Sequence, residues 1–293
     1  MPERTVIAGP HGALEVELSG PREGLVLIDH HGTPSAGRLF SEQARASGER
    51  GLRHVTYSRP GYGGSQRRPG RSVADCAADV AAIADALGAR ELLIVGTSGG
   101  GPHALACAAL LGERVLAAAS VAGVAPCDAQ GLDWSAGMGP ENIEEFGAAR
   151  AGEQQLTAYL ESEAPGLAQA NGPGLLEALG GLLSPVDAAT LTGEFAEYLA
   201  GSVRDALAPG IGGWFDDDVA FLADWGFELA AIERPVTIWQ GAQDQFVPFA
   251  HGEWLAAHVP GARAELRSEH GHLSLAVGAY GEILDGLLVA AGR

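Results

Sequence analysis

A chain of 293 residues, 46% of them hydrophobic, is long for one plain domain and short for two independent ones, so it suits one core with an insertion. The 37 acidic and 18 basic residues give a net charge of -19, which disfavours binding to nucleic acid, anionic membranes and strongly anionic substrates. Cys76, Cys107 and Cys127 are widely spaced in apolar surroundings, which predicts small buried core residues in a reducing compartment and no metal site.

The start of the chain leads into a strand-like segment and not into a charged and then apolar leader, so we expect a cytoplasmic protein. The most apolar region, residues 104–125, is interrupted by Glu113 and Arg114. It therefore predicts no membrane-spanning helix.

The first half of the chain alternates between strand and helix patterns. Residues 5–7 and 13–18, joined by a turn at 9–12, predict a hairpin at the antiparallel edge of a sheet. Buried strands are then expected at 24–29, 54–58, 92–95 and 115–121, with helices at 36–48 and 73–87 and after Pro102. Ser72 is the expected N-cap of the second helix, and Gly88 lies just beyond its end. This alternation predicts an α/β fold with a mainly parallel sheet and helices on both faces.

Strand patterns stop between residues 128 and 232, where helical segments at 142–164, 174–183 and 185–204 are punctuated by prolines. An insertion of this length is too long for an ordinary loop. We therefore divide the chain into a core at 1–127 and 233–293 and a helical cap at 128–232, which should lie over the strand ends.

Two features of the predicted cap could be functional. The run Asp216-Asp217-Asp218 could bind a metal, but three acids in the first turn of a helix complement its dipole, and we favour that interpretation. Aromatic residues could line a substrate pocket, although we expect most to form the core of the cap; they are Trp134, Phe146, Trp214, Phe215, Phe221 and Trp225.

The sheet pattern resumes near the end of the chain. Residues 235–239 predict a strand, 249–258 a helix, 262–266 a further strand and 273–291 a closing helix. The loops after the two strands carry Asp244 and His272.

The turn between the strand at 92–95 and the helix after Pro102 has the pattern Gly-x-Ser-x-Gly at residues 96–100. Such a turn forces Ser98 into a strained backbone geometry and exposes its hydroxyl. Gly96 and Gly100 are needed because a Cβ there would collide with the packed strand and helix. The alternative is a glycine-rich loop that binds phosphate through amides at a helix N-terminus.

Ser98, Asp244 and His272 follow one another in the chain at three predicted strand ends. A free serine hydroxyl is a poor nucleophile at neutral pH, so it needs an imidazole to accept its proton. The imidazolium that forms then needs an acid to hold its tautomer and stabilise its charge. The order therefore predicts a serine, histidine and aspartate triad.

With these residues in place, the sequence resembles the α/β-hydrolase superfamily over nearly all of the chain outside the cap. That resemblance implies Ser98 as nucleophile, Asp244 as acid and His272 as base, with the backbone amides of Thr33 and Gly99 as the oxyanion hole. Pro34 lacks an amide, which leaves Thr33 as the better donor. The matching segments are His31-Gly32-Thr33-Pro34, Arg59-Pro60-Gly61-Tyr62-Gly63-Gly64-Ser65, Gly96-Thr97-Ser98-Gly99-Gly100, Gly241-Ala242-Gln243-Asp244 with Val247-Pro248, and Gly271-His272.

Alternatives exist for the base and the acid. His270 could replace His272, but Gly271-His272 matches the family's placement just before the last helix. Asp128 or Asp133 follows the strand where some members keep their acid, although the Gly-x-x-Asp pattern favours Asp244. Of the other histidines, His31 should brace its loop and His103 should be structural, and the sequence gives His30 no role.

The functional hypothesis is a serine hydrolase that acts on an ester or related carbonyl of a small organic substrate through an acyl-enzyme. Carbon–carbon bond hydrolases, lactonases, cofactor-free perhydrolases and a non-catalytic ligand binder are the alternatives. The chain also resembles proline iminopeptidase-like members, but the Trp that they carry directly after the nucleophile is Gly99 here. An acid in the place of Ser98 would indicate an epoxide hydrolase or dehalogenase instead. The resemblance implies no cofactor, no metal and a small-molecule substrate, and the sequence leaves the oligomeric state open.

Overall fold

The computed structural model describes residues 2–293 and contains one sheet of eight strands in the order β1-β2-β4-β3-β5-β6-β7-β8. Strand β2 is antiparallel to β1 and to β4, and every other neighbouring pair is parallel. The predicted fold, with its antiparallel hairpin at one edge, is confirmed. The strands are β1 (Glu3–Gly9), β2 (Gly12–Ser19), β3 (Leu25–His30), β4 (Leu52–Tyr57), β5 (Leu92–Thr97), β6 (Val115–Val121), β7 (Val236–Gly241) and β8 (Arg263–Arg267).

Helices cover both faces of this sheet because its central strands are apolar on both sides. Successive side chains of a strand point to opposite faces, so Ile94 joins one buried cluster and Leu93 the other. The first face is covered by α2 (Cys76–Leu87), α3 (Gly100–Leu110) and α10 (Phe249–His258). The second face is covered by α1 (Ser41–Glu49), α11 (His272–Gly278) and α12 (Tyr280–Ala290).

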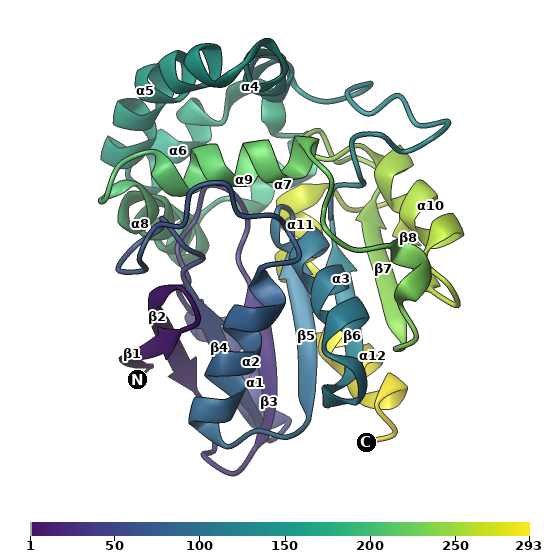
Figure 1. Ribbon diagram of the computed structural model, residues 1–293. Coiled ribbons are helices and arrows are strands. Elements are labelled where there is room, and N and C mark those ends of the chain that lie inside the picture. The colour runs from purple at the N-terminus through teal and green to yellow at the C-terminus, as the bar shows by residue number, and fades with distance from the viewer. Residues whose placement is uncertain (1) are drawn as a thin grey trace.

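Six helices lie between β6 and β7, and Figure 1 shows them across one end of the sheet, with α4 and α5 farthest from the strands. Their apolar sides form most of two small clusters, one of which joins Leu156 and Leu160 to Val203 and Trp214. The exact limits of a cap at 128–232 stay a prediction. The helices are α4 (Pro140–Ala151), α5 (Glu153–Gln169), α6 (Gly172–Ala178), α7 (Pro185–Thr190), α8 (Gly193–Leu207) and α9 (Gly212–Leu222), and short 3₁₀ turns occur at Gly112–Arg114, Gly180–Leu182 and Leu229–Ala231.

Several predicted helices are shorter or broken in the structure. The segment at 142–164 divides at Gly152, whose φ of 128° ends one helix before the next begins. The segment at 185–204 divides before Gly193, which has a φ of 54°. The last helix divides at Ala279 into α11 and α12, which are bent by 63°. Periodicity alone did not reveal these breaks because apolar spacing continues across them.

The expectation that the three aspartates occupy a first helical turn is wrong. Helix α9 begins at Gly212, so Asp216, Asp217 and Asp218 lie in its middle, and all three are buried. The early start brings Gly213 against the core, where a Cβ would lie 2.7 Å from Cγ of Tyr62. Helix α2, by contrast, begins later than expected, at Cys76, with Asp75 at its N-cap position in place of Ser72.

Among residues 2–293, no single helix combines the length and apolar composition needed to cross a membrane. The bent pair α11 and α12 meets those two criteria only when both helices are taken together.

Candidate active site

The turn after β5 holds Ser98 at φ 56°, a conformation that costs free energy for a residue with a Cβ. The adjoining glycines leave no room for side chains. A Cβ at Gly96 would lie 2.1 Å from the carbonyl oxygen of Gly100, and one at Gly100 would lie 2.1 Å from that of His30. The predicted strain at Ser98 and the need for both glycines are confirmed. Ser98 lines a cavity of about 240 Å³.

His272 opens α11 beside the loop after β7, and its Nδ1 forms a 2.7 Å hydrogen bond with Oδ2 of Asp244. Three further groups fix that carboxylate. The backbone amides of Phe246 and Val247 donate to Oδ1 at 2.9 and 2.8 Å, and Nε2 of Gln240 donates to Oδ2 at 2.9 Å. With Nδ1 engaged, Nε2 is the ring nitrogen left to face the cavity, which His272 also lines.

Burial and charge oppose one another at His272. Burial lowers the pKa of the imidazole, but the carboxylate of Asp244 outweighs it, so the pKa of His272 lies above the usual value for histidine. Burial also raises the pKa of the Asp244 carboxyl, against the effects of His272 and the Val247 amide. For this pair we expect a stabilised imidazolium, which is the charged form that a general base acquires during catalysis.

The loop after β3 brings Thr33 next to Gly99, and both residues line the same cavity as Ser98. No hydrogen bond from the backbone amide of either residue is recorded among residues 2–293, so both remain available to a ligand. A side chain at position 99 would not fit, since a Cβ there would lie 2.4 Å from Oγ1 of Thr33 and 2.9 Å from Cζ of Phe221. Within residues 2–293, Ser98 and His272 form no hydrogen bond with each other. In many enzymes this bond tightens only when substrate is bound.

Asp217 is a buried residue of the insertion that ties this loop to the core, and sequence analysis gave it no such role. Its Oδ2 accepts hydrogen bonds from Oγ1 of Thr33 at 2.6 Å and from the hydroxyl of Tyr62 at 2.9 Å. It also pairs with Arg59 and Arg71, each at 2.6 Å. Burial raises the pKa of Asp217, but the two guanidinium groups outweigh it and hold this pKa well below its usual range.

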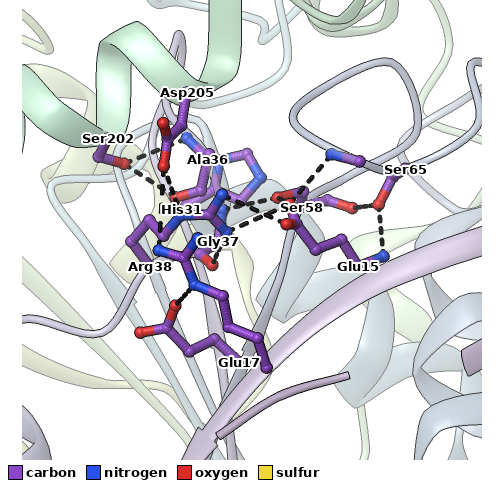
Figure 2. Close-up of polar contacts among 12 residues, drawn as sticks. Glu15, Glu17, His31, Ala36, Gly37, Arg38, Ser58, Ser65, Ser202 and Asp205 are labelled. Carbon is purple, nitrogen blue, oxygen red and sulfur yellow. Dashed lines mark hydrogen bonds and ion pairs between the residues drawn. The ribbon is translucent and has the colours of Figure 1, made fainter. Parts of the chain in front are cut away.

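The following residues of the loop are fixed from two further sides, as Figure 2 shows. Ser202 of α8 accepts a 3.2 Å hydrogen bond from the amide of Ala36 and donates a 2.9 Å one to its carbonyl oxygen. Arg38 lies between Asp205 of α8, at 2.7 Å, and Glu15 of β2, at 3.2 Å. A loop held by both the insertion and the sheet can keep an amide aimed at one point.

Asp187 in α7 is a second functional candidate that sequence analysis did not identify. It is fully buried, and its carboxylate accepts hydrogen bonds from the backbone amides of His272 at 2.9 Å and Ser274 at 2.8 Å. It therefore caps the first turn of α11, although it lies 85 residues from His272 in the chain. Gly271 leaves it the necessary space, since a Cβ there would lie 2.2 Å from Oδ2 of Asp187.

Comparisons with known proteins identify the fold family. The family model described as alpha/beta hydrolase fold matches residues 26–279, which is most of the chain. The chain belongs to the α/β-hydrolase fold family. The predicted family is thus confirmed.

One curated relative of this α/β hydrolase is a non-heme chloroperoxidase from Streptomyces lividans, 29% identical over 276 residues that cover 92% of each chain. A bromoperoxidase from Bacillus anthracis has a similar structure, with a TM-score of 0.71, 23% identity and coverage of 99% and 100% of the two chains. An esterase from Exiguobacterium antarcticum also has a similar structure, with a TM-score of 0.71, 21% identity and coverage of 99% and 100% of the two chains. Identities this low show a shared fold alone.

The alternatives considered for the acid and base lie away from the cavity of this α/β hydrolase. Asp128 and Asp133 are exposed, and neither they nor His270 line it. His31 braces its loop as expected, since its Nδ1 donates to the carbonyl oxygen of Gly32 at 2.7 Å and its Nε2 accepts from the Arg59 amide at 3.0 Å.

The cysteines are only partly as expected. Cys76 and Cys107 are buried, but Cys127 is partly exposed. The Sγ atoms of Cys76 and Cys107 are 3.9 Å apart, and that of Cys107 lies 3.5 Å from Nε2 of His30. These three buried side chains are the group that could hold a metal ion among residues 2–293. They supply three donors, whereas a closed structural zinc site has four.

Proposed function

We propose that this α/β hydrolase is a serine hydrolase that cleaves an ester or a related carbonyl compound of small size. The observation that carries the proposal is the hydrogen bond between His272 and Asp244 on the cavity that also contains the Ser98 hydroxyl. The family supports hydrolysis in general, and the choice of ester substrates rests on this arrangement of residues.

In the proposed reaction the hydroxyl oxygen of Ser98 attacks the substrate carbonyl carbon while Nε2 of His272 accepts the hydroxyl proton. The tetrahedral intermediate collapses, and the imidazolium gives that proton to the departing alcohol. Water then attacks the acyl-enzyme with His272 again as the base, which releases the acid and regenerates Ser98. Asp244 keeps the proton on Nδ1 throughout, so that Nε2 can accept one.

The negative charge of each intermediate needs donors aimed at the former carbonyl oxygen. We assign the backbone amides of Thr33 and Gly99 to this task, because neither donates a hydrogen bond to any of residues 2–293 and both residues line the cavity with Ser98. Loss of one such donor typically costs about 10² to 10³ in turnover.

The proposal is tested with p-nitrophenyl acetate and butyrate and with a fluorophosphonate that labels activated serines. We expect both esters to be hydrolysed and one phosphonyl group to attach to Ser98. The Ser98→Ala variant should lose labelling and at least about 10³-fold in turnover. Ser162→Ala, which removes an exposed hydroxyl of α5, is the matched control and should behave like the parent. Retention of activity or labelling by Ser98→Ala would refute the proposal.

A second candidate is perhydrolysis, which the similarity to a protein named a non-heme chloroperoxidase favours. Hydrogen peroxide would replace water in the second half of the reaction, so the acyl-enzyme would yield a peracid and free Ser98. The assay supplies acetate and hydrogen peroxide and follows bromination of monochlorodimedone by the hypobromite that peracid makes from bromide. A rate of peracid-dependent bromination that exceeds the rate of ester hydrolysis, and that disappears in Ser98→Ala, would support this candidate.

A further inference from the structure

The wall of the cavity that the insertion supplies is acidic. Glu141 and Glu145 of α4, Glu163 of α5 and Asp218 of α9 all line it. None of the residues that line it, among residues 2–293, is an arginine or a lysine. Apolar side chains such as Phe146 fill much of the remaining surface, so a charged ligand group inside would depend on these carboxylates for partners.

Asp218 is the decisive member of this group. Its side chain is fully buried, and within the described residues 2–293 neither carboxylate oxygen has a hydrogen-bond partner. Its two neighbours on α9 are satisfied, because Asp216 forms two 2.9 Å hydrogen bonds with Arg67 and Asp217 pairs with Arg59. A buried carboxyl without a donor is costly and rare unless a ligand provides one.

The group beside Asp218 is another carboxyl, that of Glu145, so only a shared proton can link the two. Glu145 also accepts a 2.8 Å hydrogen bond from Nε1 of Trp214. Burial, and after it the charge of Glu145, raises the pKa of Asp218 well above its usual value. Burial raises the pKa of Glu145 to about 7, and the charge of Glu163 on α5 acts in the same direction. The free protein therefore keeps a proton on this pair near neutral pH.

The positive charges near the pair do not satisfy it. The guanidinium of Arg71 lowers the pKa of Asp218, whereas the charge of Asp217 raises it. Its own partner is Asp217, at 2.6 Å, and it does not line the cavity.

We propose that Asp218 and Glu145 bind a protonated amine of the substrate, so that the enzyme acts on small carbonyl compounds that carry an ammonium group. An ammonium ion has three donors and no acceptor, which matches carboxylate oxygens that lack donors. This inference rests on the proposed function, since it places the amine relative to a carbonyl that Ser98 attacks. The cavity of about 240 Å³ restricts the substrate to a small molecule.

The test compares pairs of esters that differ only by replacement of a terminal methyl group with ammonium. The pairs are p-nitrophenyl 4-aminobutanoate with pentanoate, and p-nitrophenyl 6-aminohexanoate with heptanoate. For at least one pair we expect kcat/KM to favour the amino ester by about tenfold or more, as a hydrogen bond to a charged group typically contributes. Hexylammonium should also inhibit hydrolysis of the neutral ester at lower concentration than hexanol does.

Variants locate the effect within the cavity. Asp218→Asn and Glu145→Gln keep shape and remove charge, and in each the ratio of the two kcat/KM values should fall toward one. Glu144→Gln is the matched control, because Glu144 is the exposed neighbour of Glu145 on α4, and there the ratio should stay at the parent value. If Asp218→Asn does not fold, Glu145→Gln and the hexylammonium comparison decide the matter.

The preference should also depend on pH. Binding of ammonium requires an ionised pair, so the ratio should rise as pH increases through about 7 and fall below it, and Glu145→Gln should flatten this rise. Phosphonylation of Ser98 together with ratios near one for both pairs would overturn the inference and leave the proposed function intact. Absence of labelling and of turnover on every ester would overturn the proposed function itself.

Discussion

At the scale of single residues, Asp244 decides the orientation of the His272 ring. Its carboxylate accepts from Nδ1 of that ring and from two backbone amides of its own loop, so it has little freedom to turn. Phe246 stacks on the other side of the imidazole, with ring centroids 4.5 Å apart. The ring is therefore held before any substrate arrives, which a general base requires.

Replacement of Asp244 by Asn should reduce the turnover of p-nitrophenyl acetate by about 10⁴-fold, because the amide favours the wrong tautomer of His272. The acid limb of the pH profile should also move to lower pH, because the carboxylate that raises the pKa of His272 has gone. Initial rates from pH 5 to 9 provide both readouts, with Asp128→Asn as an exposed control. Unchanged turnover in Asp244→Asn would assign the acid elsewhere.

At the scale of elements, the insertion positions the ends of core elements. Helix α7 places Asp187 at the start of α11, and α9 places Asp217 against the loop that carries Thr33. Each contact gives hydrogen-bond donors at a helix terminus or in a loop a buried acceptor. A substitution in the insertion should therefore change the turnover of the enzyme and not only its substrate preference.

Asp187→Ala would leave the amides of His272 and Ser274 buried without an acceptor, at a cost of about 1–3 kcal/mol each. We expect turnover to fall by about tenfold or more at 25 °C, because the start of α11 would shift to find new partners. Asp187→Asn keeps one carbonyl oxygen and should recover part of the loss. Glu194→Gln, at an exposed position of α8, controls for charge, and equal turnover in all variants would argue against a positioning role.

At the scale of the whole molecule, core and insertion meet around one buried charge. Asp217 joins α9 to Arg59 and Arg71 of the core, and all three side chains are almost completely buried. Removal of one partner from such a cluster leaves uncompensated charge in the interior. The insertion and the sheet should consequently unfold together.

Asp217→Asn should lower the free energy of unfolding at pH 7 by about 3–5 kcal/mol in urea titrations. The folded pKa of Asp217 lies below its unfolded value, so its contribution is complete above that value of about 3.9 and is lost as pH falls further. The parent should therefore lose more stability between pH 4 and pH 2 than Asp217→Asn does. A matched loss in both proteins would contradict this assignment, and Asp128→Asn should follow the parent.

The local parts of the molecule could be predicted from the sequence. Apolar runs marked the strands, Gly96 and Gly100 marked the turn that strains Ser98, and the chain order indicated which acid and base to expect. These features depend on neighbours within a few residues, which a single sequence records directly. The breaks at Gly152 and Gly193 were missed because helical spacing continues on both sides of a bend.

Tertiary structure alone decided what the three aspartates of α9 do. Asp216 bonds to Arg67, Asp217 pairs with Arg59 across 158 residues of chain, and Asp218 is a buried residue of the cavity wall. Local sequence carries no record of such a partner, because packing of the insertion on the sheet selects it. The sequence by itself therefore determined the fold and the order of the reactive residues, whereas packing determined which carboxyls are buried, which are paired and which line the cavity.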